Sequence, residues 1–256
     1  MKIKILGSGT STGVPEVGCT CPVCTSKDVR DSRLRTSAWI CEDDTRILLD
    51  CGPDFRQQML RLHDFHRING VLITHEHYDH VGGLDDLRPF CRFGEIPLYA
   101  EAYTAEDLRK RLPYCLVEHV YPGVPRIYLK EIKPGCPFFI GKVEVFPFRV
   151  MHGRLPILGY RIGGKLGYIT DMLTMPDESY NCLQGIDVLI MNALRIQPHP
   201  THQCIAEAIR TAERIGARET YLIHMSHHVG LHAEIGHMLP SNIHFAYDGL
   251  ELETVT

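Results

Sequence analysis

The stretch Ile73-Thr-His-Glu-His-Tyr-Asp-His-Val81 decides the fold class predicted for this chain of 256 residues. It continues an apolar run that begins at Gly70, so the sequence predicts a short strand that ends in a polar loop. Four potential metal ligands lie close together in that loop: His75, His77, Asp79 and His80. Side chains alternate along an extended segment, so the first two histidines point to one side and the other two ligands follow a turn. One peptide can therefore contribute ligands to two neighbouring metal ions.

A chance cluster of surface histidines is the alternative, since the chain has 15 histidines. The metal site is favoured because an acidic residue stands at the third ligand position and because the cluster follows a strand. Three further predicted strands, over residues 142–150, 166–170 and 219–223, lead to isolated metal-binding residues. These are His152, Asp171 and His224. Strands of α/β folds present functional residues at one edge of the sheet, so we expect all three to join the cluster.

A hairpin predicted from the apolar runs 37–41 and 46–50 has Asp50 at its exit, closely followed by Gly52. Such an aspartate could orient the neighbouring metal loop through hydrogen bonds, or it could be an ordinary turn residue. The spacing leaves both interpretations open. Helices are predicted over residues 55–62, 104–112 and 204–215, with another after the Gly82-Gly83 turn.

Length and composition are those of one globular α/β domain spanning residues 1–256, with 44% apolar and 23% charged residues. No run of about 18 apolar residues could cross a membrane, and the start of the chain resembles no signal peptide. We therefore expect a cytoplasmic protein without a membrane partner. The net charge of −4 provides no overall attraction to nucleic acid. A homodimer is left open as the assembly.

Gly18-Cys-Thr-Cys-Pro-Val-Cys24 places three thiols in one tight loop, residues 18–25. Zinc sites rich in thiolate commonly take several ligands from one such knuckle, so Cys19, Cys21 and Cys24 predict a structural zinc with a fourth ligand elsewhere. Three free thiols are the alternative. A redox pair is disfavoured because Cys21 and Cys24 do not begin an obvious helix. The ten cysteines of the chain fit a reducing compartment.

The order His75-x-His77-x-Asp79-His80, then His152, Asp171 and His224, resembles the metallo-β-lactamase superfamily over nearly the whole chain. The resemblance implies a four-layer αββα sandwich with the site at one edge of its two sheets. It also implies two groups of ligands. One metal would be held by His75, His77 and His152, the second by Asp79, His80 and His224, and both would be bridged by Asp171.

Asp171 stands where the hydrolytic lactamases have a cysteine, so the chain resembles the phosphodiesterase branch. The motifs Gly7-Ser-Gly-Thr-Ser-Thr-Gly-Val-Pro15, His224-Met-Ser-His227 and Tyr247-Asp-Gly249 are similar to the phosphodiesterases of the carbon–phosphorus lyase pathway, relatives of tRNase Z. That resemblance implies that His227 completes the structural zinc site of Cys19, Cys21 and Cys24. The adjacent His228 is the rival ligand.

The implied activity is hydrolysis of a small phosphodiester, expected to be cyclic, by a hydroxide held between two zinc or manganese ions. Asp79 would belong to the catalytic centre, and His202 matches the family's histidine that protonates the leaving group. His199 is its rival, and a surface histidine at a helix start is the ordinary alternative. Two other functions remain as alternatives. One is tRNA 3′-end processing, the activity of the tRNase Z relatives that share the metal set and the histidine at 202, with the Arg109-Lys-Arg111 patch as a candidate tRNA contact; the other is a non-hydrolytic metal-binding sensor or scaffold.

Overall fold

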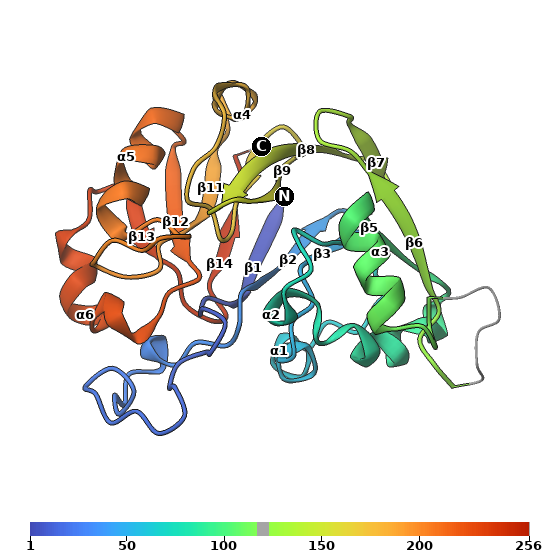
Figure 1. Cartoon of the computed structure of the whole chain (residues 1–256), viewed down its shortest axis with the longest axis horizontal. Helices are drawn as coiled ribbons and strands as arrows, with labels where there is room; N and C mark the ends of the chain where they lie inside the picture. The colour runs from blue at the N-terminus through green and yellow to red at the C-terminus, as the bar shows by residue number, and fades with distance from the viewer. Residues whose placement is uncertain (117–122, 256) are drawn as a thin grey trace.

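Two seven-stranded sheets form the centre of the computed structural model, which describes residues 1–116 and 123–255 (Figure 1). The first sheet has the order β14-β1-β2-β3-β4-β5-β6, with strands β1 (Lys2–Gly7), β2 (Ser37–Glu42), β3 (Thr45–Leu49), β4 (Gly70–Leu72), β5 (Ile96–Glu101), β6 (Ile127–Ile132) and β14 (Glu251–Glu253). The second has the order β13-β12-β11-β10-β9-β8-β7, with strands β7 (Phe138–Ile140), β8 (Val143–His152), β9 (Leu155–Ile162), β10 (Leu166–Tyr168), β11 (Val188–Asn192), β12 (Glu219–Ile223) and β13 (Ile243–Phe245).

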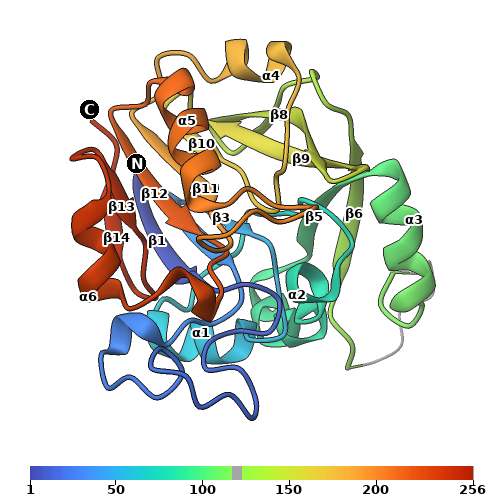
Figure 2. The ribbon, with the colours of Figure 1, turned by 60° about the vertical axis from the view of Figure 1, so that its left-hand side comes forward.

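Helices cover the outer face of each sheet, as Figures 1 and 2 show. The α-helices are α1 (Phe55–Leu62), α2 (Tyr78–Val81), α3 (Ala102–Arg111), α4 (Asp177–Cys182), α5 (Ile205–Ile215) and α6 (His232–Ile235). Short 3₁₀ helices are η1 (Val29–Asp31), η2 (Leu84–Phe93), η3 (His227–Val229) and η4 (Gly236–Met238). Helix α5 begins where Glu207 accepts a hydrogen bond from the Cys204 amide and ends at Gly216, whose φ of 71° suits glycine.

Three separate apolar layers show that the molecule has four structural layers. Between the sheets, side chains such as Ile40 of the first sheet and Ile190 of the second pack together. The helices on the first sheet bury a second layer, which includes Phe55, and those on the second sheet bury a third, which includes Ala208. The predicted αββα sandwich of the metallo-β-lactamase type is therefore confirmed.

Parallel pairing of neighbouring strands brings their carboxyl ends to the same edge of each sheet. In the first sheet β3 runs parallel to β4, with Leu49 opposite Leu72, so the two strands end side by side. In the second sheet β10, β11 and β12 are parallel, and their ends lie at one edge. The carboxyl ends of parallel strands are where α/β folds place their sites. This register explains how residues far apart in the chain meet.

The local structure differs from the sequence prediction in several places. Strand β8 extends through His152, and strand β10 ends at Tyr168, two residues before the predicted end. Strand β4 ends at Leu72, so His75 and His77 lie in an irregular segment, and Asp79 and His80 lie on the single turn of α2. The helix predicted after Gly83 is a 3₁₀ helix, which contains Pro89. The described residues contain no helix long and apolar enough to cross a membrane.

Candidate metal centre

Three residues at the strand exits, two candidate ligands and one residue that orients a ligand, have an unusual backbone conformation. Asp50 after β3, Asp171 after β10 and His224 after β12 have φ angles of 54°, 55° and 54°. Residues other than glycine seldom adopt this left-handed region, and it is retained where the surrounding structure enforces it. The side chains at these exits meet around the second group of ligands: Asp50 contacts His80, and Asp171 contacts both His80 and His224.

The first cluster consists of His75, His77 and His152, whose ligand atoms all lie within 4.8 Å of one another. The Nε2 atom of His75 is 3.0 Å from Nδ1 of His77. The other ring nitrogen of His75 is 2.9 Å from the Thr74 hydroxyl, and His152 directs Nδ1 at the Thr201 carbonyl oxygen at 3.0 Å. These contacts leave Nε2 of His75 and His152 and Nδ1 of His77 to face the centre of the cluster.

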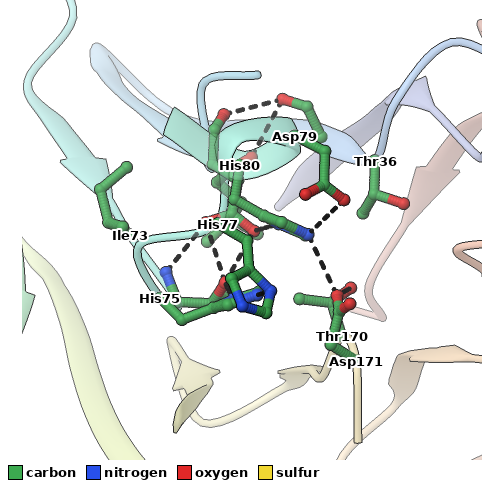
Figure 3. Close-up of polar contacts among 12 residues, drawn as sticks. Thr36, Ile73, His75, His77, Asp79, His80, Thr170 and Asp171 are labelled. Carbon is green, nitrogen blue, oxygen red and sulfur yellow. Dashed lines mark hydrogen bonds and ion pairs between the residues drawn. The ribbon is translucent and has the colours of Figure 1, made fainter. Parts of the chain in front are cut away.

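The second cluster consists of four buried residues, Asp79, His80, Asp171 and His224. Figure 3 shows how Asp79 and Asp171 converge on the His80 ring. Nε2 of His80 lies 3.1 Å from a carboxylate oxygen of each aspartate. Nε2 of His224 lies 3.1 Å from the other oxygen of Asp171. The Asp171 carboxylate therefore stands between two imidazoles, and it also groups with His152 of the first cluster and with His202.

The charges of the second cluster fit a metal ion. Burial alone would lower the pKa of His80, but Asp79, Asp171 and Asp50 raise it well above its ordinary value. Nε2 of His80 nevertheless makes no hydrogen bond within the described chain. Buried carboxylates around an imidazole nitrogen that makes no hydrogen bond form a donor set that a divalent cation would satisfy. Both clusters therefore suit the binding of divalent metal ions.

Asp50 orients the second cluster through its contact with Nδ1 of His80. Its carboxylate is fully buried, accepts hydrogen bonds from the amide and hydroxyl of Thr74, and lies 2.8 Å from Nδ1 of His80. A carboxylate at Nδ1 holds the proton there and keeps Nε2 free to bind a metal. Gly52 explains the Asp-x-Gly spacing, because a Cβ atom there would stand 2.0 Å from the Asp79 carbonyl oxygen. The structure thus favours the orienting role of Asp50 over that of an ordinary turn residue.

The structure places His202, and not His199, against both clusters. The His202 ring packs 4.5 Å from that of His152 and 5.2 Å from that of His224, measured between centroids. Its Nδ1 lies 3.7 Å from an Asp171 oxygen. His199 lies behind it and accepts a hydrogen bond from the Thr201 amide. Burial, with the His224 charge, lowers the pKa of His202 to about 3, so its ring is neutral near pH 7.

The cysteine loop meets a histidine from the other end of the chain. The sulfur atoms of Cys19, Cys21 and Cys24 lie 3.1, 3.5 and 3.2 Å from Nδ1 of His227. His228 is outside this group and contacts Nε2 of His227 at 3.0 Å. Three thiols and one imidazole within ligand distance of a common point match a closed structural zinc site. Geometry therefore selects His227 over His228, as the resemblance implied.

Comparison with known proteins agrees with this arrangement. The family model of the beta-lactamase superfamily domain matches residues 45–225. The chain belongs to the metallo-β-lactamase superfamily. A solved structure described as a new diphosphatase from the PhnP family is 38% identical, with a TM-score of 0.91 over 98% of this chain and 96% of that one. Zinc-bound PqqB from Methylobacterium extorquens shares the fold at 21% identity, with a TM-score of 0.82 over 99% and 100% of the chains.

A curated relative from Porphyromonas gingivalis strain W83, named octanoyltransferase, is 51% identical over 253 residues. These residues are 98% of this chain but 51% of that protein, so the chain spans about half the length of the relative. The transferase name describes a protein of about twice this size. It is therefore not carried over to the superfamily domain described here.

Apart from Asp50, sequence reasoning missed the groups that orient the ligands. Thr74, Thr201 and the hydroxyls of Thr36 and Thr170 each contact a ring nitrogen of a ligand histidine. Threonine is common in strands, and nothing in its spacing marks these four. Thr74, Thr170 and Thr201 directly precede the candidate residues His75, Asp171 and His202, whereas Thr36 has no such neighbour. The roles of His75 to His224 as metal ligands stay predictions of the metallo-β-lactamase resemblance.

Proposed function

We propose that this superfamily hydrolase is a two-metal phosphodiesterase that acts on a small, cyclic phosphodiester. Asp171 carries the proposal, because its buried carboxylate lies between the two clusters where a lactamase would have a thiolate. A carboxylate can share its two oxygens between neighbouring divalent ions, and paired ions suit the displacement of an oxygen at phosphorus. Similarity to a diphosphatase of the PhnP family supports phosphorus chemistry.

The protein would divide the ligands between two ions. One ion would be held by His75, His77 and His152, and the other by Asp79, His80 and His224, with Asp171 shared. When bound, such a pair activates water and neutralises charge on the phosphate oxygens. Asp50 and the threonines hold the imidazoles in one tautomer, so that the site is organised before the substrate arrives. Burial of the second cluster excludes bulk water.

His202 would donate a proton to the leaving oxygen. Burial keeps the ring neutral before the substrate binds. Approach of the anionic phosphate would favour uptake of a proton, and the imidazolium would then donate it to the leaving oxygen and return to neutral imidazole. The His202→Ala variant should bind both ions. Its kcat should fall by about 10²- to 10⁴-fold for diesters with alkoxide leaving groups and much less for p-nitrophenyl diesters.

His199→Ala is the matched control, since His199 lies beside His202 and outside the clusters. It should retain most activity on both kinds of substrate. Equal losses on alkoxide and p-nitrophenyl leaving groups in His202→Ala would contradict the acid role and leave the ring with a role in binding or structure.

Hydrolysis of a diphosphate is the second candidate, because the solved relative with 38% identity is a diphosphatase. The tRNA-processing alternative is weaker. Arg109, Lys110 and Arg111 each form an ion pair, with Glu131, Glu106 and Asp107 respectively, so that patch is neutralised within the chain. A phosphate-binding surface needs cations free to contact the backbone of the nucleic acid. A sensor or scaffold without hydrolysis is disfavoured because all seven proposed ligands are present and close together.

One parallel assay separates these functions. The protein, with its metal content measured, is given bis-p-nitrophenyl phosphate, 2′,3′-cyclic nucleotides, a nucleoside diphosphate derivative and precursor tRNA. The proposal predicts turnover of the first two. Preference for the diphosphate would support the second candidate, and cleavage of the tRNA alone would support processing. Two bound ions without turnover of any diester or diphosphate would contradict the hydrolase proposal.

A further inference from the structure

We infer that Thr36 is a positioning residue that fixes the tautomer of His224. The loop directly after β1, residues 8–10 and here called the N-terminal loop, sets this tautomer through Thr36. The inference rests on the proposed two-metal centre, because it concerns how one ligand is presented to the second ion. Thr36 lies between η1 and β2, about 190 residues from His224 in the sequence, and its side chain is buried beside the second cluster (Figure 3).

The Thr36 hydroxyl donates its hydrogen to a backbone carbonyl and so has none left for His224. Oγ1 donates to the carbonyl oxygen of Gly9 at 2.8 Å and lies 3.3 Å from Nδ1 of His224. Because the hydroxyl donates to Gly9, its oxygen can only accept from the ring. Thr170 behaves in the same way: its hydroxyl donates to Asp171 at 2.6 Å, and its oxygen lies 3.4 Å from the same Nδ1. One N–H shared between two acceptors accounts for both of these longer distances.

The two acceptors at Nδ1 of His224 determine which ring nitrogen carries the proton and which can bind a metal. A neutral imidazole carries one proton, so a proton held at Nδ1 leaves the lone pair of Nε2 exposed toward Asp171. The opposite tautomer would place a hydrogen on the atom that must bind the metal. His80 obtains the same control from the Asp50 carboxylate, which can only accept. At His224 the acceptors are hydroxyls, so the outcome depends on where each hydroxyl donates.

The N-terminal loop determines the direction of the Thr36 hydroxyl. The Gly9 amide donates to the Leu34 carbonyl at 2.8 Å, which keeps the loop beside the segment that leads to Thr36. The loop also binds the residue after His224, since Met225 donates to Ser8 at 3.0 Å and accepts from Thr10 at 3.1 Å. A Cβ atom at Gly9 would stand 2.8 Å from the Arg33 carbonyl oxygen, so the close approach requires glycine.

Thr36→Val tests the inference because it removes the hydroxyl and keeps the shape of the side chain. Thr220→Val is the matched control: Thr220 is buried on β12, and its hydroxyl makes no hydrogen bond to any described residue. Cobalt is titrated into metal-free protein against a chelator, and thiolate absorption counts the ion in the cysteine loop separately. In Thr36→Val the second ion of the centre should bind about 10- to 100-fold more weakly, with the first unchanged.

Thr36→Ser should bind within a few-fold of the wild type, because it restores the hydroxyl. The tautomer is measured without any variant, by ¹⁵N NMR of histidine-labelled, zinc-loaded wild-type protein, where His224 should carry its proton on Nδ1; the metal-free protein is unsuitable because the Asp171 carboxylate, 3.1 Å from Nε2, could itself accept a proton there. A proton on Nε2 would overturn the inference even if Thr36→Val failed to fold. Equal affinities in Thr36→Val and Thr220→Val would also overturn it. Fewer than two ions in the wild-type centre would instead overturn the proposed function.

Discussion

Replacement of Asp50 by asparagine should weaken the binding of the second metal ion to the centre while preserving the fold. The wild-type carboxylate accepts from the Thr74 amide at 2.9 Å and lies 2.8 Å from Nδ1 of His80. Asparagine has one acceptor oxygen. If that oxygen stays with Thr74, the amide NH₂ group faces Nδ1 of His80 and requires it to accept. The ring proton then moves to Nε2, the atom that the second ion needs.

The structure also gives the size of the effect. The lost contact is a buried hydrogen bond to a charged group, worth about 1.5–3 kcal/mol. A tenfold change in affinity corresponds to about 1.4 kcal/mol, so the second ion should bind roughly 10- to 100-fold more weakly in Asp50→Asn. The asparagine side chain fills the same volume as the aspartate, so the metal-free variant should unfold cooperatively, as the wild type does.

Chelator competition with metal analysis measures this loss. Asp64→Asn provides the comparison, because Asp64 also accepts from several side-chain donors, among them Trp39 and Arg46, and its contacts do not reach either cluster. The comparison variant should retain wild-type affinity for both ions of the centre. Wild-type affinity in Asp50→Asn, or an equal loss in both variants, would refute the tautomer argument.

Three further predictions concern the supports of the centre. Gly52→Ala should displace the Asp79 backbone, which a Cβ atom would approach to 2.0 Å, and should lower both metal content and melting temperature; a variant with full metal content would contradict this. Cys24→Ala should lose the ion of the cysteine loop, and protease cleavage within residues 18–25 should become faster; unchanged cleavage and zinc content would argue against a structural zinc. Burial raises the pKa of Asp248 to about 6, so the folded protein binds this proton more tightly than the unfolded chain does. Its stabilising contribution is therefore complete below about pH 4 and falls by about 3 kcal/mol as the pH rises through 6. The free energy of unfolding of the wild type minus that of Asp248→Asn should shrink over this range in urea titrations, whereas a difference independent of pH would contradict the shift.

The candidate ligands could be located from the sequence because apolar runs of strand length lead to the segments that carry them, while their assignment to metal ions stays a prediction of the family resemblance. A strand exit is a local pattern, and the pairing of β3 with β4 and of β10 with β12 through β11 then brings these exits together. The αββα layering came from the family resemblance instead. Apolar alternation identifies strands, but it does not say which strands of two sheets face each other across Ile40 and Ile190.

An orienting role for Asp50 could be proposed from its position, but the other orienting groups could not be predicted, because most of them act across a long separation in the sequence. Thr36 contacts His224, and the Thr201 carbonyl contacts His152, yet neither partner changes the local pattern around the other. The choice between His227 and His228 had the same difficulty. The two residues are adjacent, and only the path of the cysteine loop determines which ring it meets. Contacts of this kind depend on the tertiary structure, which local sequence patterns do not encode.

Backbone strain connects the fold to the proposed chemistry. Local rules place glycine where φ is positive, yet Asp50, Asp171 and His224 occupy such positions at three strand exits. Glycine there would relieve the backbone and remove a ligand or the group that orients one. The parallel sheets and the buried hydrogen bonds of Thr74 and Thr36 hold these residues in place despite the strain. The rule for glycine fails where side-chain chemistry is needed, and such a conflict between local preference and fold is expected at a functional site.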